Sequence, residues 1–493
     1  MKRKWTTLVV SCILTVSTVM VGSLTALAAP KSSPDGTEIP AKTFAIAFSN
    51  KLPVDYVEKI QAAGGQVVRA IPEIGGLEVR SSSTDFMSKL QSFKDIAAAN
   101  VQMVHKLNDG TVETSSADSQ PVTDIPQPEA TNSYWNYQWD IKKVTNDGAS
   151  FGIESGGLNG KHKAVVGIID SGIDANHPDL KANFIGGMNF VPAGIDATET
   201  GNPTDLLDRE GHGTHVAGSI AGNGKIKGVG PNLGIRSYRV FPGGQGAPTS
   251  WIVAAIVQAA NDKVDVINMS IGGFDSQKYY IEGSKYSDIA DILLWKRAIQ
   301  YAVNHNVTVV TAAGNEGLDL NNKKEMTDYL NATYGSPDVV FKGKTTETPG
   351  QIEGVINVSS SNQWSTKSIA FYSNYGKNQI DVASPGGDNG PVYDSTLDLN
   401  QRDFHYRALS TWPTYLEPYF TSNLHNYALL HGTSMAAPKV AGIAGVIKAA
   451  HPELTPPQVA ALIKKTAIDY GPTGNDALFG AGEANAYNAL KAK

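Results

Sequence analysis

The chain has 493 residues and a formal net charge of −6, with 41% hydrophobic and 18% charged residues. Its length exceeds that of one ordinary domain, and its composition is typical of folded globular proteins and not of disordered ones. The mild negative charge gives no indication of the basic patch that nucleic-acid binding requires. We therefore expect a globular protein with a large core and no nucleic-acid partner.

Residues 1–28 have the composition of an export signal. Basic residues at 2–4 precede a mainly apolar run at 8–24, and Ala26-Leu27-Ala28 forms a small-x-small cleavage site. The alternative is a membrane anchor, but Ser and Thr interrupt the run, and no later run reaches the ~20 apolar residues of a membrane span. We expect a signal peptide that is removed, leaving a secreted, extracellular protein without a membrane anchor.

The only cysteine, Cys12, lies inside the predicted signal peptide. The mature chain would then have no disulfide and no thiolate ligand for a metal. For an exported protein, this predicts that the packed core provides the stability that disulfides provide in many small secreted domains.

Residues 42–106 are predicted to form a small ferredoxin-like α+β domain. Residues 107–133 follow as a linker, because they are rich in Ser, Thr, Asp and Pro and contain no Lys or Arg. The elements expected in the small domain alternate in the order strand, helix, strand, strand, helix, strand, at 44–48, 53–63, 66–71, 77–80, 84–93 and 98–105.

The main domain is predicted to cover residues 135–493, where apolar β-branched runs alternate with helical patterns. This alternation predicts an α/β fold in which helices cover both faces of a parallel sheet. In such sheets, functional groups gather at the carboxyl ends of the strands. The clearest strand signals lie at 164–169, 264–269 and 307–311, and the clearest helical patterns at 251–261 and 292–303.

Three segments carry residues that could activate a nucleophile. Asp170 directly follows an apolar strand, His212 lies among glycines, and Ser434 begins an apparent helix of small residues. A serine hydroxyl needs a base to take its proton, and the base needs a carboxylate to fix its tautomer. A helix N-terminus also favours the negative charge that develops on the serine. Each segment alone is typical of an ordinary turn.

In the order Asp, His, Ser, however, the three motifs together resemble the subtilisin family of serine proteases. The resemblance covers about residues 135–489 and implies a subtilisin-like α/β fold with Asp170, His212 and Ser434 as the catalytic triad. The implied activity is that of a serine endopeptidase, which hydrolyses peptide bonds through an acyl-enzyme on Ser434. The alternative from a different class is a non-catalytic, peptide-binding member of the family.

The resemblance extends to residues that would hold the substrate. Asn315, which follows a predicted strand, matches the family's oxyanion donor, and the alternative is an asparagine in a left-handed turn. Ser270, Ile271 and Gly272 match the strand against which the family binds peptides, and 237–241 resembles a second rim of the same groove. A substrate would add there as an extended strand.

Alignment of residues 348–350 with the family places Glu347 in the wall of the primary specificity pocket. A carboxylate there would attract an Arg or Lys side chain just before the scissile bond. The alternative is that Glu347 is a solvated loop residue. Lys106 is the last basic residue before the linker. Self-cleavage after Lys106, giving a mature chain that begins at Leu107, would agree with the pocket interpretation.

Short motifs at 138–141, 238–241 and 259–262 resemble those of lantibiotic leader peptidases, a group within the family that removes leaders from ribosomally made antimicrobial peptides. The alternative is a broad-specificity extracellular subtilisin. The domain at 42–106 resembles the subtilisin propeptide, which implies an intramolecular inhibitor and folding aid in a self-processing zymogen. The expected partners are a peptide or protein substrate, such as a lantibiotic precursor, and the chain's own propeptide.

This chemistry requires no cofactor, and no metal ligand is predicted among the site residues. His212 and His215, with Asp208 nearby, could be read as zinc ligands, but no further ligand follows at a recognisable spacing. Asp179 matches a carboxylate of the family's calcium site. The segment at 221–228 is shorter than in calcium-binding members. The sequence therefore leaves open whether a structural calcium ion binds there.

Overall fold

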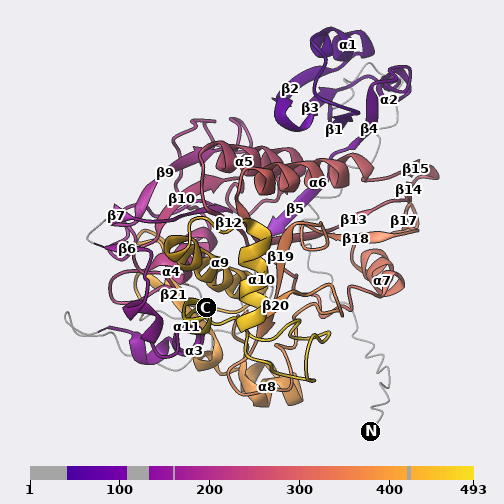
Figure 1. The fold of residues 1–493 in the computed structure, drawn as a ribbon. Coiled ribbons are helices and arrows are strands. Elements are labelled where there is room, and N and C mark those ends of the chain that lie inside the picture. The colour runs from indigo at the N-terminus through magenta and orange to yellow at the C-terminus, as the bar shows by residue number, and fades with distance from the viewer. Residues whose placement is uncertain (1–40, 108–132, 159–160, 419–423, 493) are drawn as a thin grey trace.

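The computed structural model describes residues 41–107, 133–158, 161–418 and 424–492. The predicted signal peptide and most of the predicted linker therefore lie outside the described residues. A small N-terminal unit and a large α/β domain are joined by a short additional sheet (Figure 1). None of the described helices is long and apolar enough to cross a membrane.

The N-terminal unit has the predicted order of elements, and its strands pair antiparallel in the order β2-β3-β1-β4. Phe44, Ile46 and Phe48 pack in the unit's own core, whereas Ala45 and Ala47 belong to a core of the large domain. This alternation gives β1 two buried faces. The elements are β1 (Lys42–Phe48), α1 (Tyr56–Ala63), β2 (Gln66–Ile71), β3 (Gly76–Ser81), α2 (Phe86–Leu90) and β4 (Ile96–Val101).

The large domain contains a seven-stranded sheet of order β20-β19-β16-β12-β8-β10-β9. Every neighbouring pair in it is parallel, which confirms the predicted parallel sheet. The strands are β8 (Val165–Asp170), β9 (Phe184–Asn189), β10 (Gly234–Arg239), β12 (Val266–Met269), β16 (Thr308–Ala312), β19 (Val355–Ser361) and β20 (Val382–Pro385).

Helices cover both faces of this sheet, as predicted. α3, α4, α9, α10 and α11 pack around a core that contains Ile168 and Val266, and α5 and α6 pack around a core that contains Ile169 and Ile267. Neighbouring strand residues thus point to opposite, equally apolar faces. The helices are α3 (Trp139–Thr145), α4 (His212–Ala221), α5 (Thr249–Asn261), α6 (Ile289–Asn304), α7 (Lys323–Tyr334), α8 (Gly390–Thr396), α9 (Thr433–Ala450), α10 (Pro456–Thr466) and α11 (Ala486–Lys491).

The sheet of the N-terminal unit is docked on α5 and α6 (Figure 1). Polar side chains of the unit meet the N-termini of both helices. The Asn100 side chain accepts the backbone N–H of Ala290 at 2.7 Å, and Glu78 accepts the hydroxyl of Ser250 at 2.9 Å. Because the first N–H groups of a helix have no partner within it, such acceptors stabilise the contact.

A four-stranded sheet of order β11-β5-β13-β18 joins the two units. The strand predicted at 98–105 is in fact two strands, because β5 leaves the N-terminal sheet to pair with the large domain. Between them, the Gln102 side chain donates to Ser250 at 2.8 Å, and the N–H of Met103 donates to Asp291 at 3.4 Å. The strands are β5 (Val104–Leu107), β11 (Ala247–Pro248), β13 (Ile271–Ser276) and β18 (Thr345–Thr348).

Two segments, 318–346 and 393–418, contribute peripheral elements. The first contains α7 and a strand that extends a neighbouring hairpin, and the second contains a strand of a separate antiparallel pair. The remaining strands are β6 (Gly157–Leu158), β7 (Lys161–His162), β14 (Tyr279–Ile281), β15 (Ser284–Tyr286), β17 (Val339–Phe341), β21 (Ala408–Thr411) and β22 (Tyr427–Leu430).

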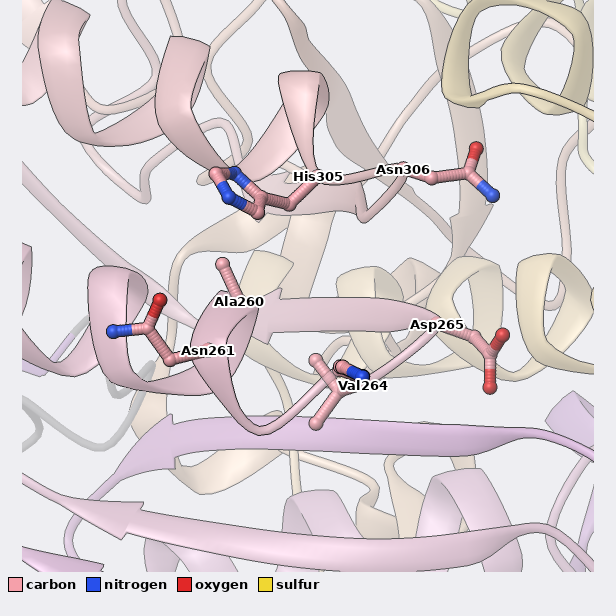
Figure 2. A pocket seen from close by; sticks show the side chains of 7 residues that line it. Ala260, Asn261, Val264, Asp265, His305 and Asn306 are labelled. Atoms are coloured by element: carbon pink, nitrogen blue, oxygen red, sulfur yellow. The ribbon is translucent and has the colours of Figure 1, made fainter.

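A pocket opens at the amino-terminal ends of β12 and β16, next to the last turns of α5 and α6 (Figure 2). His305 and Asn306 lie on one side of it, and Asn261 and Asp265 on the other. Asp265 already accepts the backbone N–H of Val165 at 2.8 Å. Parallel sheets place ligand sites at the opposite, carboxyl ends of their strands. This pocket is therefore separate from the candidate site.

Candidate active site

Asp170 and His212 form the first part of the candidate site, at the carboxyl end of β8. Asp170 is the last residue of this central strand and is fully buried. His212 is the first residue of α4, and its Nδ1 lies 2.8 Å from Oδ1 of Asp170. The N–H of Ser171 donates to the same oxygen at 2.7 Å. Because Nδ1 faces the carboxylate, the other ring nitrogen is the one that can accept a proton.

Glycines permit this close approach of α4 to β8. A Cβ on Gly213 would lie 2.2 Å from the carbonyl oxygen of Gly172 and 3.2 Å from the carboxylate of Asp170. Gly211, just before the helix, has a φ of +94°, which residues with a Cβ rarely adopt. The glycines around His212 are therefore required by the geometry of the pair.

Ser434 lies at the start of α9, the second helix of the site. It is the second residue of this helix, it is buried, and its Oγ donates to the carbonyl of Ser270 at 3.3 Å. Because α4 and α9 pack against each other, His212 and Ser434 begin neighbouring helices. The positive end of the helix dipole favours negative charge on Oγ. The structure thus brings Asp170, His212 and Ser434 to one edge of the sheet.

Asn315 follows β16 and faces the start of α9. Its Oδ1 accepts two hydrogen bonds from Thr433, from the backbone N–H at 2.9 Å and from the hydroxyl at 2.7 Å. With the oxygen held in this way, the amide NH₂ group points to the other side, where it can donate. Gly314, and not Asn315, has a positive φ, of +99°, so the alternative of a left-handed asparagine is wrong.

Residues 270–272 lie along one side of a groove that β5 fills. β13 pairs antiparallel with β5, with Ile271 opposite Leu107 and Gly272 opposite Lys106. β11 pairs with the other edge of β5. The end of the N-terminal unit is thus an inner strand of the four-stranded sheet, paired on each side with an edge of the large domain, as an added peptide strand pairs with a sheet edge.

The second rim of the groove differs from the predicted one. Residues 237–239 belong to β10, inside the main sheet, and Tyr238 is buried. The observed rim is β11, which follows the glycine-rich turn after β10. The two segments flank the same turn, and an apolar strand pattern does not distinguish a central strand from a short edge strand beside a groove.

The side chain of His105 on β5 is buried against the large domain. It is 2% exposed, its ring meets Trp295 edge-on with 5.3 Å between centroids, and its Nε2 lies 3.0 Å from the hydroxyl of Thr249. Burial lowers the pKa of His105 to about 4. Trp295 and Thr249 carry no motif that would mark them in the sequence as contacts of this strand. Only the Thr249-Ser250 pair before a helical pattern, which is typical of a helix start, could have indicated this region.

Glu347 is a buried acid, so the alternative of a solvated loop residue is wrong. It lies on β18 opposite Phe274, is 1% exposed, and forms no hydrogen bond of regular geometry through either carboxyl oxygen. Burial raises the pKa of Glu347 well above its ordinary value, and the charges of Glu316 and Asp275 add to the rise. A Cβ on Gly350 would come within 2.2 Å of the carboxyl, so this glycine leaves the space that the acid occupies.

The residues considered as metal ligands have other partners. His215 lies 3.2 Å from the carbonyls of both Ala408 and Ala428. Oδ2 of Asp179 accepts the N–H of Ile226 at 3.0 Å and the hydroxyl of Tyr427 at 3.1 Å. Calcium requires oxygen ligands and not N–H donors, so the surroundings of Asp179 do not fit the ion. In the described ranges, no group of three or more His, Cys, Asp or Glu residues is placed to hold a metal.

Comparisons with known proteins match this architecture to a family. Residues 161–482 match the profile described as Subtilase family. The nisin leader peptide-processing serine protease NisP of Lactococcus lactis subsp. lactis is 35% identical over 328 residues, which are 64% of this chain and 45% of NisP. The epidermin leader peptide-processing serine protease EpiP of Staphylococcus epidermidis is 29% identical over 445 residues, 88% of this chain and 90% of EpiP.

Solved structures agree with the fold. The crystal structure of EpiP from Staphylococcus aureus has a TM-score of 0.72 and 27% identity, over 92% of this chain and 99% of EpiP. That of NisP from Lactococcus lactis has a TM-score of 0.61 and 30% identity, over 74% of this chain and 96% of NisP. The predicted subtilisin-like fold is therefore confirmed, and the chain belongs to the subtilase family of serine endopeptidases.

Proposed function

We propose that this subtilase is a secreted enzyme that hydrolyses peptide bonds through an acyl-enzyme on Ser434. The observation that carries the proposal is the buried Asp170–His212 pair, 2.8 Å apart, at the sheet edge where Ser434 and Asn315 also lie. His212 takes the proton of Ser434 as its Oγ attacks the carbonyl carbon, and Asp170 stabilises the imidazolium. His212 then gives the proton to the leaving amine, and water hydrolyses the acyl-enzyme. The export signal in the sequence supports secretion.

We propose that the residue before the scissile bond is Arg or Lys. A buried acid without a cationic partner is costly as an anion, and no ion pair joins Glu347 to a cation among the described residues. A guanidinium or ammonium group of the substrate would supply the opposite charge, and exclusion of water would strengthen the pair. The carboxyl groups of Glu316 and Asp275, whose charges would add to the rise in the pKa of Glu347, make the surroundings of this acid more favourable to a cation. An apolar side chain would leave the acid unpaired.

The physiological substrate that we propose is a lantibiotic precursor, from which the enzyme removes the leader peptide. NisP and EpiP are leader peptide-processing proteases by name. A broad-specificity extracellular subtilisin would need an uncharged pocket wall, which Glu347 does not provide. Asp170, His212, Asn315 and Ser434 are all present, so a non-catalytic member would need a loss elsewhere in the chain. Labelling by a fluorophosphonate, which reacts only with an activated serine, tests the latter alternative.

We propose that the N-terminal unit is the enzyme's propeptide and intramolecular inhibitor. Its support is the position of β5 between β11 and β13, where a substrate strand would bind. Lys106 lies opposite Gly272 and Leu107 opposite Ile271, and the structure describes β5 only as far as Leu107. Cleavage after Lys106 stays a proposal, and it agrees with the basic preference proposed for Glu347.

Removal of the nucleophile is expected to abolish both proteolysis and self-processing, because one serine serves both reactions. Ser434→Ala should accumulate as the secreted precursor. Asn315→Ala should lower kcat by about 10²–10³ with little change in KM, because the oxyanion exists only late in the reaction. Kinetics on a peptide substrate test both. A raised KM at unchanged kcat would assign Asn315 to binding, and maturation of purified Ser434→Ala would reject the nucleophile.

Glu347→Gln is expected to lower kcat/KM for a substrate with Arg before the scissile bond by about 100-fold, because the substrate cation loses its buried partner. For the matched substrate with Met at that position, kcat/KM should rise or stay unchanged. Glu353→Gln removes the same charge from an exposed position nearby and is the control. Equal losses for the Arg and Met substrates in Glu347→Gln would contradict the pocket assignment.

The first self-cleavage is expected after Lys106, because a lysine before the scissile bond agrees with the basic preference proposed for Glu347. Sequencing the N-terminus of the mature chain at the earliest time of processing tests this, before trimming within the linker begins. A first N-terminus that follows an apolar or acidic residue would contradict the prediction.

Binding of the separated N-terminal unit is expected to weaken as the pH falls from about 6.5 toward 4, because only neutral His105 fits its pocket. With a pKa of about 4 when bound and an ordinary value of 6.5 when free, affinity should fall roughly 30-fold between pH 7.5 and 5. The partner in the titration is the Ser434→Ala chain from which immobilised wild-type enzyme has first removed the N-terminal unit.

His105→Gln is the control for this experiment, because it keeps polarity but does not titrate. Burial raises the pKa of Asp291 to about 6, which has the opposite effect on binding, but Asp291 is present in both complexes. The difference between the two pH profiles therefore isolates the histidine. Superimposable profiles would show that His105 does not control release.

A further inference from the structure

The helix that carries Ser434 is interrupted in its first turns. Pro438 lies inside α9 and has no backbone N–H, so the carbonyl of Ser434, four residues earlier, has no helical donor. The hydroxyl of Ser270 donates to this carbonyl instead, at 2.8 Å. The proline ring also crowds the preceding turn. The start of α9 therefore depends on side chains for part of its position.

The side chain of Lys439 forms a hydrogen bond with the next carbonyl of the same turn, that of Met435. Its Nζ donates to the carbonyl of Met435 at 2.9 Å, and its side chain is completely buried. A buried ammonium group needs a counterion, and Oδ2 of Asp140 lies 2.8 Å away with 1% of the side chain exposed. The charge of Lys439 also reaches the neighbouring helix. Together with burial, it lowers the pKa of His215, three residues after His212.

Asp140 stands in the first turn of α3, where the helix dipole favours an acidic side chain. The same helix makes a second ion pair, between Lys143 and the buried Glu483, at 2.9 Å. Glu483 precedes α11 and lies outside α9. Helix α3 is therefore attached to the molecule by two ion pairs, of which only the one with Lys439 reaches the helix of the nucleophile.

We propose that Asp140 and Lys439 are positioning residues, whose buried ion pair fixes the proline-interrupted turn of α9 and so holds Ser434 in place for attack. The inference rests on the proposed role of Ser434 as the nucleophile. Neither residue has a place in the groove, so the pair acts on the rate of attack and not on substrate binding. A pair of apolar residues could fill the same volume, but it could not hold the carbonyl of Met435.

The experiment compares Asp140→Asn, Lys439→Met and the double variant Asp140→Leu/Lys439→Met with Lys143→Met as the matched control. Full-length chains are matured with immobilised wild-type enzyme, which is then removed. For each, kcat, KM, the rate of fluorophosphonate labelling and the thermal midpoint are measured. The two single variants should lose thermal stability, because each leaves one buried charge or polar group without its partner.

The double variant separates positioning from stability. It should recover the thermal midpoint, because apolar residues of similar size often replace a buried ion pair without loss. Its kcat and labelling rate should stay lower by about 10- to 100-fold at unchanged KM, since small misplacements of a nucleophile have effects of this size. Lys439→Arg, which keeps the cation, should recover part of kcat. Lys143→Met should lower the thermal midpoint while kcat stays unchanged.

Wild-type kcat in the double variant would overturn the proposal. So would a loss of kcat in Lys143→Met as large as that in Asp140→Asn, because anchoring of α3 in general would then explain both. If the double variant stays unstable, Lys439→Arg becomes the deciding variant. A loss of kcat in Lys439→Arg as large as that in Lys439→Met would also overturn the proposal. A wild-type chain that neither hydrolyses peptides nor reacts with the fluorophosphonate would reject the proposed function instead.

Discussion

The burial of one carboxylate, Asp170, is the constraint from which the rest of the site follows. A carboxylate taken out of water needs hydrogen-bond donors, and these are the N–H of Ser171 and the ring of His212. For the ring to reach it, α4 must pass close to the end of β8, which Gly213 permits. α9 packs on α4 and adds Ser434. The order of the strands in the sheet thus determines where the chemistry can occur.

The groove beside this site recognises its occupant in two different ways. β11 and β13 hold the backbone of β5 through strand pairing, which any extended segment can satisfy. Pockets add selectivity. The His105 ring is buried against Trp295, and in the proposed specificity the buried acid Glu347 would pair with a cation. Under that proposal, the same strand edges would serve an inhibitor and a substrate whose side chains differ, because the backbone contacts would be common to both.

Much of the fold could be predicted from the sequence because the signals are local. Alternation along Phe44–Phe48 and the apolar run before Asp170 are visible within a few residues, and the motifs around His212 and Ser434 led to the family. The departure of β5 from the N-terminal sheet could not be predicted, because a strand pattern does not specify the partner strand. The prediction of the second rim at 237–241 was wrong for the same reason, since the strand beside β5 is β11.

The buried contacts around the site could not be predicted from the sequence, because they join segments that are distant along the chain. Asp140 and Lys439 look like ordinary charged residues of two helical patterns, and only packing shows that both are buried. The resemblance indicated a specificity role for Glu347, but its burial depends on β13, β18 and the turn at Gly350 together. Charged residues are usually exposed, so a sequence pattern gives little reason to expect them inside.

The position of β5 between β11 and β13 has a consequence for substrates if the N-terminal unit is released as we propose. Two strand edges would then face each other across the width of a single strand. Only a segment whose N–H and C=O groups are unused on both sides could enter. In a folded domain these groups are already bonded, so local unfolding would have to come first, and its free energy would add to the barrier. Under this proposal, each substrate's own stability would contribute to the selectivity of the enzyme.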